Sequence, residues 1–289
     1  MTRAEPLIAE RAEPLVEPRA ELTGAPRSTT SALTQWWVLT TRAVVPTLRN
    51  GELVTQVAAS IMFTVGFYIP LKHFMGVYAR DMSSYAQYLM PLIALQAVSF
   101  AAISGGFRSA TDSVAGINRR FRSMPIPRAV PMAARMSASM YRCAVALVLS
   151  IVCGYVIGFR FYGGVGHTAG FCLLVLLVGA ALGFLGDFIG AASRNPDATT
   201  HLMMLPQLVF GLLSVGVQPV QRFPTWIQGF VRDQAISQFV FALRALAGDT
   251  TPAAGVVSWS VVGPAVAWAV GMIAVLVPLY LLVVVRRVG

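Results

Sequence analysis

The stretch "GFCLLVLLVGAALGFLGDFIGAA", residues 170–192, decides the fold of this chain. It is apolar almost throughout and carries a single charged side chain, Asp187. A helix of about 20 apolar residues crosses a hydrocarbon core about 30 Å thick. The stretch therefore predicts a transmembrane helix.

The composition of the whole chain agrees with a membrane protein. Of its 289 residues, 56% are hydrophobic and only 12% are charged, whereas soluble proteins carry about 25% charged residues. The 22 Lys and Arg outnumber the 12 Asp and Glu. Because the arginines lie between apolar runs, they are more typical of membrane orientation than of a nucleic-acid surface, and we expect no nucleic-acid partner.

Six apolar runs predict an all-α, polytopic membrane protein with six spans in one transmembrane domain over residues 54–287. The runs are residues 54–71, 85–106, 138–158, 170–192, 201–217 and 258–284. The fifth is short and contains Pro206.

Two segments precede the first span. Residues 1–30 are rich in Pro, Glu, Ala and Arg, which predicts a disordered cytosolic tail; the alternative is a docking peptide for a partner. In residues 31–50, apolar side chains recur at helical spacing, and Trp36 and Trp37 lie near Arg42. This pattern predicts an amphipathic helix at the membrane interface, with a possible kink before Pro46; the alternative is a soluble linker helix.

The positive charges predict the orientation. If the N-terminus is inside, fifteen Lys and Arg fall in cytosolic segments and six in outer segments. Cytosolic loops of membrane proteins carry the excess of Lys and Arg. We therefore expect both termini in the cytosol and a multi-pass protein of the cytoplasmic membrane.

The chain lacks the residues for most kinds of catalysis. Its only lysine is Lys72, so it has no phosphate-binding P-loop. His73, His167 and His201 are far apart in the sequence and have no partner at metal-ligand spacing. We expect no cofactor and no catalytic or metal site, although an intramembrane lipid-modifying enzyme stays open as an alternative.

Two charged residues fall inside predicted spans. Arg142 lies near the cytosolic end of the third span and Asp187 near the cytosolic end of the fourth. We interpret them as a structural ion pair. The alternative is an ion-coupled secondary transporter, in which an intramembrane carboxylate such as Asp187 carries a proton.

A basic segment, "NRRFRSMPIPR" at residues 118–128, lies between the second and third spans. A short cytosolic helix is predicted here, with Asp112 near its start and Arg119 and Arg120 at its end. Pro125 and Pro127 would stop it. Such a rigid element can act as a lever if a cytosolic partner pushes on it.

Taken together, the six spans, the interfacial helix and the basic segment resemble permeases of type-2 ABC exporters. After the fifth span, Phe223-Pro224, Trp226, Ala242 and Arg244 match the family pattern, while Gln234-Ala235 stands where the family has Asn-Pro. The resemblance covers about residues 30–287. It is closest to the daunorubicin-resistance branch, which includes mycobacterial permeases linked to export of phthiocerol dimycocerosate.

The resemblance implies a mechanism and partners. Two permeases, alike or different but with a heterodimer favoured, would pair among the membrane lipids above cytosolic ABC ATPases, which would hold ATP and Mg²⁺. The substrate would be large and hydrophobic: a complex lipid such as phthiocerol dimycocerosate, or an amphiphilic antibiotic such as daunorubicin.

The resemblance also implies two groups of site residues. The ATPase-coupling element, at about residues 112–126, would use Asp112, Arg119, Arg120, Phe121, Arg122, Met124 and Pro125. The outer segment 223–247 would form short re-entrant helices as an extracellular gate, with Phe223, Pro224, Trp226 and Arg244.

Overall fold

The computed structural model describes residues 31–49, 51–76, 84–124, 126–127, 129–193, 195–249 and 256–286. The chain divides into Met1–Ser31 and Ala32–Gly289, and the account below concerns the second unit. The predicted disordered tail lies outside the described residues. The helices are α1 (Ala32–Arg49), α2 (Glu52–Gly76), α3 (Tyr85–Val114), α4 (Ile117–Ser123), α5 (Ala129–Ile157), α6 (Gly164–Ala192), α7 (Pro196–Leu212), the 3₁₀ helix η2 (Val220–Arg222), α8 (Gln228–Asp233), α9 (Ala235–Ala247) and α10 (Trp259–Arg286).

Five of these helices, α2, α3, α5, α6 and α10, are long and apolar enough to cross a membrane. They confirm the all-α membrane fold and five of the six predicted spans. The remaining predicted span forms α7, which has 17 residues. At 1.5 Å per residue it is about 25 Å long, which is less than the roughly 30 Å of a hydrocarbon core. That α7 crosses the membrane stays a prediction.

The α7 helix is also shifted toward the N-terminus: it begins about five residues before the start of the predicted run 201–217 and ends about five residues before its end. The side chain of Asn195 accepts hydrogen bonds from the backbone N–H groups of Asp197 and Ala198, and Pro196 occupies the first turn. These residues favour the start of a helix. They lie in polar sequence, so a prediction from apolar runs alone does not include them.

The α3 helix is the centre of the bundle. It packs against α2, α5, α6, α7 and α9, and most of its side chains are buried. This helix is less apolar than α6 and α10, and it carries the buried polar side chains Gln87 and Gln96. Polar side chains of membrane helices face other helices and not lipid, which agrees with the position of α3 inside the other spans.

Glycines allow a close contact between the backbones of α3 and α6. A Cβ atom on Gly190 would lie 2.6 Å from the carbonyl oxygen of Gly106, and one on Gly186 would lie 3.1 Å from the Gly106 Cα. Small residues four positions apart let membrane helices approach closely. Gly186 and Gly190 therefore fix the distance between these two spans.

Both α3 and α5 extend beyond the predicted apolar runs. The second span was predicted to end at residue 106 and the third to begin at residue 138, whereas α3 continues to Val114 and α5 begins at Ala129. The added turns carry Arg108 and Arg135, which have acidic partners on neighbouring helices. Because these charges are paired, the helices can continue past the apolar runs.

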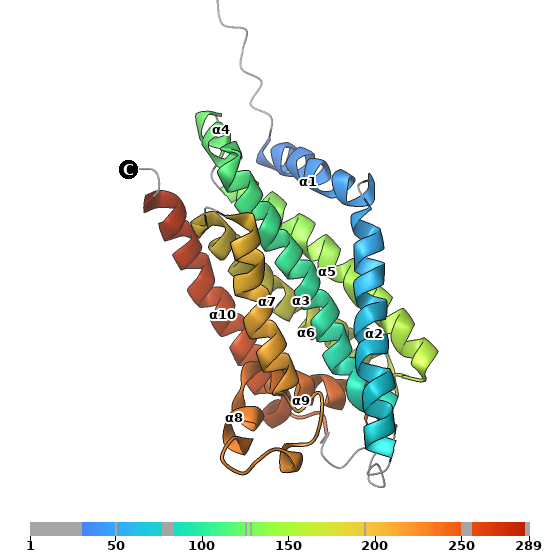
Figure 1. Cartoon of the computed structure of the whole chain (residues 1–289). Helices are drawn as coiled ribbons and strands as arrows, with labels where there is room; N and C mark the ends of the chain where they lie inside the picture. The colour runs from blue at the N-terminus through green and yellow to red at the C-terminus, as the bar shows by residue number, and fades with distance from the viewer. Residues whose placement is uncertain are drawn as a thin grey trace, which may run out of the picture. The chain divides into compact units, whose positions relative to one another are not determined.

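The α1 helix lies across the end of the bundle from which α4 extends, and α8 and α9 lie at the opposite end (Figure 1). It runs through Pro46 as one helix. The indole Nε1 of Trp36 donates a hydrogen bond to Ser137 Oγ on α5, at 3.1 Å, while Trp37 is exposed. The predicted amphipathic helix is therefore present; that it lies at a membrane interface stays a prediction.

Candidate functional site

The predicted coupling helix corresponds to α4, joined to α3 by a sharp turn. Gly116 caps α4 with φ of +71°, a left-handed conformation that glycine adopts at little cost. The helix ends at Ser123, and Met124 is extended. Asp112 was expected near the start of this short helix; instead it lies in the last turn of α3, because α3 continues to Val114.

The side chains predicted to contact a cytosolic ATPase point in different directions. Arg120 and Met124 are exposed, whereas Phe121 is half-buried and lines a cavity. The side chains of Arg119 and Arg122, and Pro125 as a whole, lie outside the described residues. Of the two predicted apolar contacts, Met124 is thus exposed and Phe121 is half-buried at the cavity.

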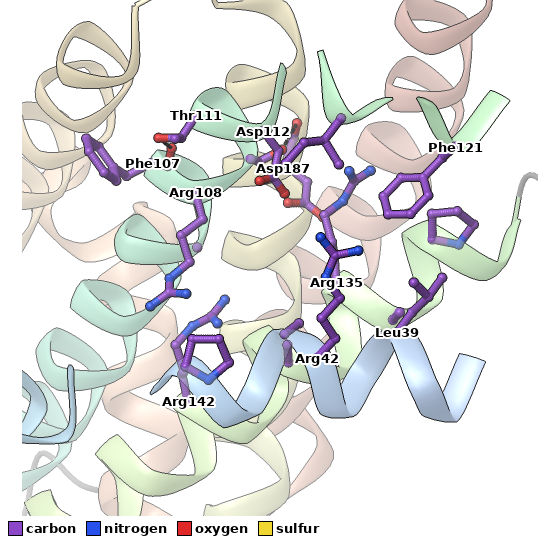
Figure 2. A pocket seen from close by; sticks show the side chains of 18 residues that line it. Leu39, Arg42, Phe107, Arg108, Thr111, Asp112, Phe121, Arg135, Arg142 and Asp187 are labelled. Atoms are coloured by element: carbon purple, nitrogen blue, oxygen red, sulfur yellow. Dashed lines mark hydrogen bonds and ion pairs between the residues drawn. The ribbon is translucent and has the colours of Figure 1, made fainter. Parts of the chain in front are cut away.

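The cavity behind Phe121, here called the arginine cavity, has a volume of about 360 Å³. Residues of α1, α3, α4, α5 and α6 line it, and Figure 2 shows their side chains. Its charged lining residues are Arg42, Arg108, Arg135, Arg142, Asp112 and Asp187. The walls also include apolar side chains, among them Leu39, Pro46 and Phe121.

The ion pairs around this cavity differ from the one predicted. Arg142 Nε lies 3.9 Å from an oxygen of Glu52, the first residue of α2, and Arg108 contacts the same carboxylate. Asp187 lies 4.0 Å from Arg135 Nε. The predicted Arg142–Asp187 pair is therefore replaced by two pairs. Arg135 and Arg142 are seven residues apart, so they lie on one face of α5. Each pairs with an acidic residue of a different helix, Arg135 with one of α6 and Arg142 with one of α2.

Three residues of this network, Glu52, Arg108 and Arg135, were missed in the sequence. Arg135 also donates a hydrogen bond to the hydroxyl of Tyr280 on α10. The seven-residue spacing of Arg135 and Arg142 was a signal for a shared face. Their partners depend on which helices pack together, and no spacing in the sequence gives that.

The predicted outer gate residues also occupy different environments. Phe223 is buried, Pro224 is exposed, and Trp226 is 81% exposed. Arg244, on α9, is only 1% exposed. Its Nε donates a hydrogen bond to the backbone oxygen of Tyr88 at 3.0 Å, and its Nη2 donates to that of Val215 at 2.7 Å.

Arg244 therefore anchors the outer segment to α3. Burial lowers the pKa of its guanidinium, while the Tyr88 side chain acts in the opposite direction. Of the predicted gate residues, Pro224 and Trp226 are exposed, whereas Phe223 and Arg244 are buried.

Gln234-Ala235, which departs from the family's Asn-Pro pattern, forms the junction between α8 and α9. Gln234 has an extended backbone, and its amide nitrogen donates a hydrogen bond to the carbonyl oxygen of Leu213. The side chain thus ties this junction to the end of α7.

No group of three or more His, Cys, Asp and Glu side chains that could hold a metal ion occurs among the described residues. Three arginines of the site, Arg108, Arg135 and Arg142, are paired with carboxylates of other helices. This arrangement can link helix movements or bind an anion, and it contains no arrangement of a nucleophile and a base.

Comparison with known proteins agrees with this geometry. Residues 34–246 match the ABC-2 type transporter family. The doxorubicin resistance ABC transporter permease protein DrrB of Mycobacterium tuberculosis is 52% identical over 258 residues, which cover 88% of this chain and 89% of that protein. The daunorubicin resistance permease DrrB1 of Streptomyces coeruleorubidus is 28% identical over 71% of each chain.

A third relative, the probable doxorubicin resistance permease DrrC of Mycobacterium tuberculosis, is 26% identical over 72% of this chain and 75% of its own. The family match spans most of the chain, and the apolar helices agree with a multi-pass membrane protein. The chain belongs to the ABC-2 type transporter family, as a permease subunit of an ABC transporter and hence a transport component rather than an enzyme.

Proposed function

We propose that this permease moves a large hydrophobic substrate out of the cytoplasmic membrane, driven by a separate cytosolic ATPase. The observation that carries the proposal is the 52% identity, over 88% of the chain, to a permease named for doxorubicin resistance. ABC-2 permeases work with a cytosolic ATPase subunit, and this chain has no P-loop of its own.

The substrate class is supported by the surface of the bundle. A groove of about 640 Å³ lies along α6 and α10, and its lining includes Leu185, Pro264, Trp268 and Met272. No charged side chain lines it. An acyl chain or a flat aromatic ring fits such a surface, as in a complex lipid such as phthiocerol dimycocerosate or an antibiotic such as doxorubicin.

For coupling, we assign α4 as the element that receives force from the ATPase. It is short, it follows a sharp turn at Gly116, and it presents Arg120 and Met124 outward. On its other side, half-buried Phe121 lines the arginine cavity together with residues of α1 and α5. A push on α4 would therefore reach α3 and α5, the second and third spans.

A second permease of different sequence completes the proposed exporter. Mycobacterium tuberculosis has two relatives of this chain, DrrB at 52% and DrrC at 26% identity. Two such different permeases in one organism favour a heterodimer in which this chain takes the DrrB position.

The test uses inverted membrane vesicles that contain this chain, its ATPase and the second permease. ATP should drive uptake of doxorubicin, followed by fluorescence, or of a radiolabelled long-chain wax ester. Vesicles without this chain, and vesicles with an ATPase inactivated at its P-loop lysine, are the controls. Uptake of neither substrate above both controls, with all subunits present, would contradict the proposal.

A further inference from the structure

We propose that the arginine cavity binds the phosphate group of an anionic membrane phospholipid. The cavity lies at the end of the bundle that α1 crosses, between α1, α3, α4 and α5 (Figure 2). The proposal is independent of the transported substrate.

The first argument is the charge of the cavity. Four arginines line it, against two carboxylates. Glu52 does not line the cavity, and its single carboxylate forms ion pairs with two of these arginines, Arg108 and Arg142. Even with Glu52 counted, the four arginines outnumber the three carboxylates, so the cavity carries a net positive charge that a bound anion would balance.

The second argument is that donors are left over. Arg142 is 4% exposed, and its Nε makes no hydrogen bond with any described residue; the closest paired carboxylate oxygen is 3.9 Å away. On α1, Arg42 has no carboxylate within 4 Å in the described part of the chain. Guanidinium groups bind phosphate oxygens through paired hydrogen bonds, so a phosphate between these helices would meet both needs.

The third argument is depth. The α1 helix carries exposed Trp37 and Arg49, residue types that favour the headgroup layer. Arg42 and Thr111 are exposed lining residues, so the cavity reaches the surface at this level. Leu39 and Phe121 supply apolar walls beside the arginines. Polar and apolar walls together suit the glycerol phosphate of a lipid better than a free anion.

The experiment uses the full-length permease in detergent and measures lipid binding by the shift in its melting temperature and by native mass spectrometry. The probes are phosphatidylglycerol, phosphatidylcholine and inorganic phosphate. We expect phosphatidylglycerol to bind more tightly than phosphatidylcholine. Arg42→Gln should weaken its binding by roughly tenfold, since it removes the charge-assisted hydrogen bonds of one guanidinium to the phosphate.

Two further variants separate the cavity from general charge. Ala43→Leu fills part of the cavity without changing charge and should also weaken phosphatidylglycerol binding. Arg49→Gln removes another exposed arginine of α1, one that does not line the cavity, and binding should be unchanged.

The outcomes decide the source of the phosphate group as well. Saturable stabilisation by inorganic phosphate that Arg42→Gln weakens, without a preference between the two lipids, would keep the site and assign it to free phosphate. Equal effects of Arg42→Gln and Arg49→Gln would show that lipid binding depends only on the general positive charge of the surface, and would overturn the proposal. Binding of neither probe to folded wild-type protein would overturn it too.

Discussion

The guanidinium of Arg244 lies over the ring of Tyr88, 3.4 Å from its centroid. The Tyr88 hydroxyl and Arg244 Nη2 both donate hydrogen bonds to the carbonyl oxygen of Val215. One contact thus joins α9, α3 and the chain after α7. A cation over an aromatic ring, shielded from water, is stabilising, so this contact holds the outer segment on the bundle.

Replacing Arg244 should therefore destabilise the protein. Arg244→Met removes hydrogen bonds from a charged donor, each of which contributes roughly 1.5–3 kcal/mol, and leaves buried carbonyl oxygens without this donor. Arg244→Lys should lower the stability less, because lysine keeps the positive charge although it lacks the planar guanidinium with its several donors. The melting temperature in detergent is the measurement, and exposed Arg232→Met on α8 is the control. Equal melting temperatures for the Arg244 and Arg232 variants would refute the anchoring role.

The carboxylate of Glu52 should matter for folding more than for transport. Glu52→Gln removes the carboxylate that pairs with Arg142 and Arg108, and breaking a buried ion pair costs about 3–5 kcal/mol in a deep site and less near the membrane surface. Asp187→Asn should act in the same way through Arg135. Both should lower the yield of folded protein, while transport per folded molecule changes little. Exposed Asp233→Asn is the matched control. Normal folding with abolished transport in Asp187→Asn would support a proton-carrying role instead.

The contact of α3 with α6 depends on glycine. Gly190→Ala would place a Cβ atom 2.6 Å from the Gly106 carbonyl oxygen, so the two helices must separate. We expect a loss of about 1–3 kcal/mol, as in other overpacked interiors. Gly271→Ala on α10 is the control, because nothing lies within 4 Å of its added Cβ. The comparison requires only melting temperatures, and a Gly190→Ala variant as stable as Gly271→Ala would contradict it.

The two apolar residues near the end of α4 should have separable effects. Met124→Ala removes an exposed apolar side chain and should weaken co-purification with the ATPase, since apolar anchors carry much of an interface's energy. Phe121→Ala loosens α4 in the arginine cavity and should keep ATPase binding but uncouple hydrolysis from export. Ile126→Ala, just beyond α4, is a control. Wild-type export with normal ATPase binding in both variants would show that α4 is not the coupling element.

The orientation of the bundle can be tested with single cysteines at Ser123 and Thr225, both exposed, after Cys143, Cys153 and Cys172 have been replaced. An impermeant thiol reagent applied to intact cells should label the Thr225 site only. Both should react once the membrane is opened. Labelling of the Ser123 site in intact cells would reverse the orientation predicted from the arginines.

The sequence by itself determined the class of the protein. Long apolar runs predict membrane helices because the bilayer leaves the backbone few other choices, and five of the six predicted spans are long enough in the structure. The helical periodicity before the first span likewise predicted α1, and residues around Phe223 and Arg244 pointed to the family. Each of these patterns involves residues that are close together in the sequence, so it can be recognised without knowledge of the tertiary structure.

Only the tertiary structure decided how the charged residues are paired. The sequence placed Arg142 and Asp187 near one membrane surface, yet Arg142 meets Glu52 and Asp187 meets Arg135, because the packing of α2 and α6 on α5 chooses the partners. Only the tertiary structure shows that Arg244 is buried and Trp226 is exposed, although both residues lie in the same outer segment. Burial and ion pairing depend on contacts between helices far apart in the chain, and those contacts exist only once the bundle has formed.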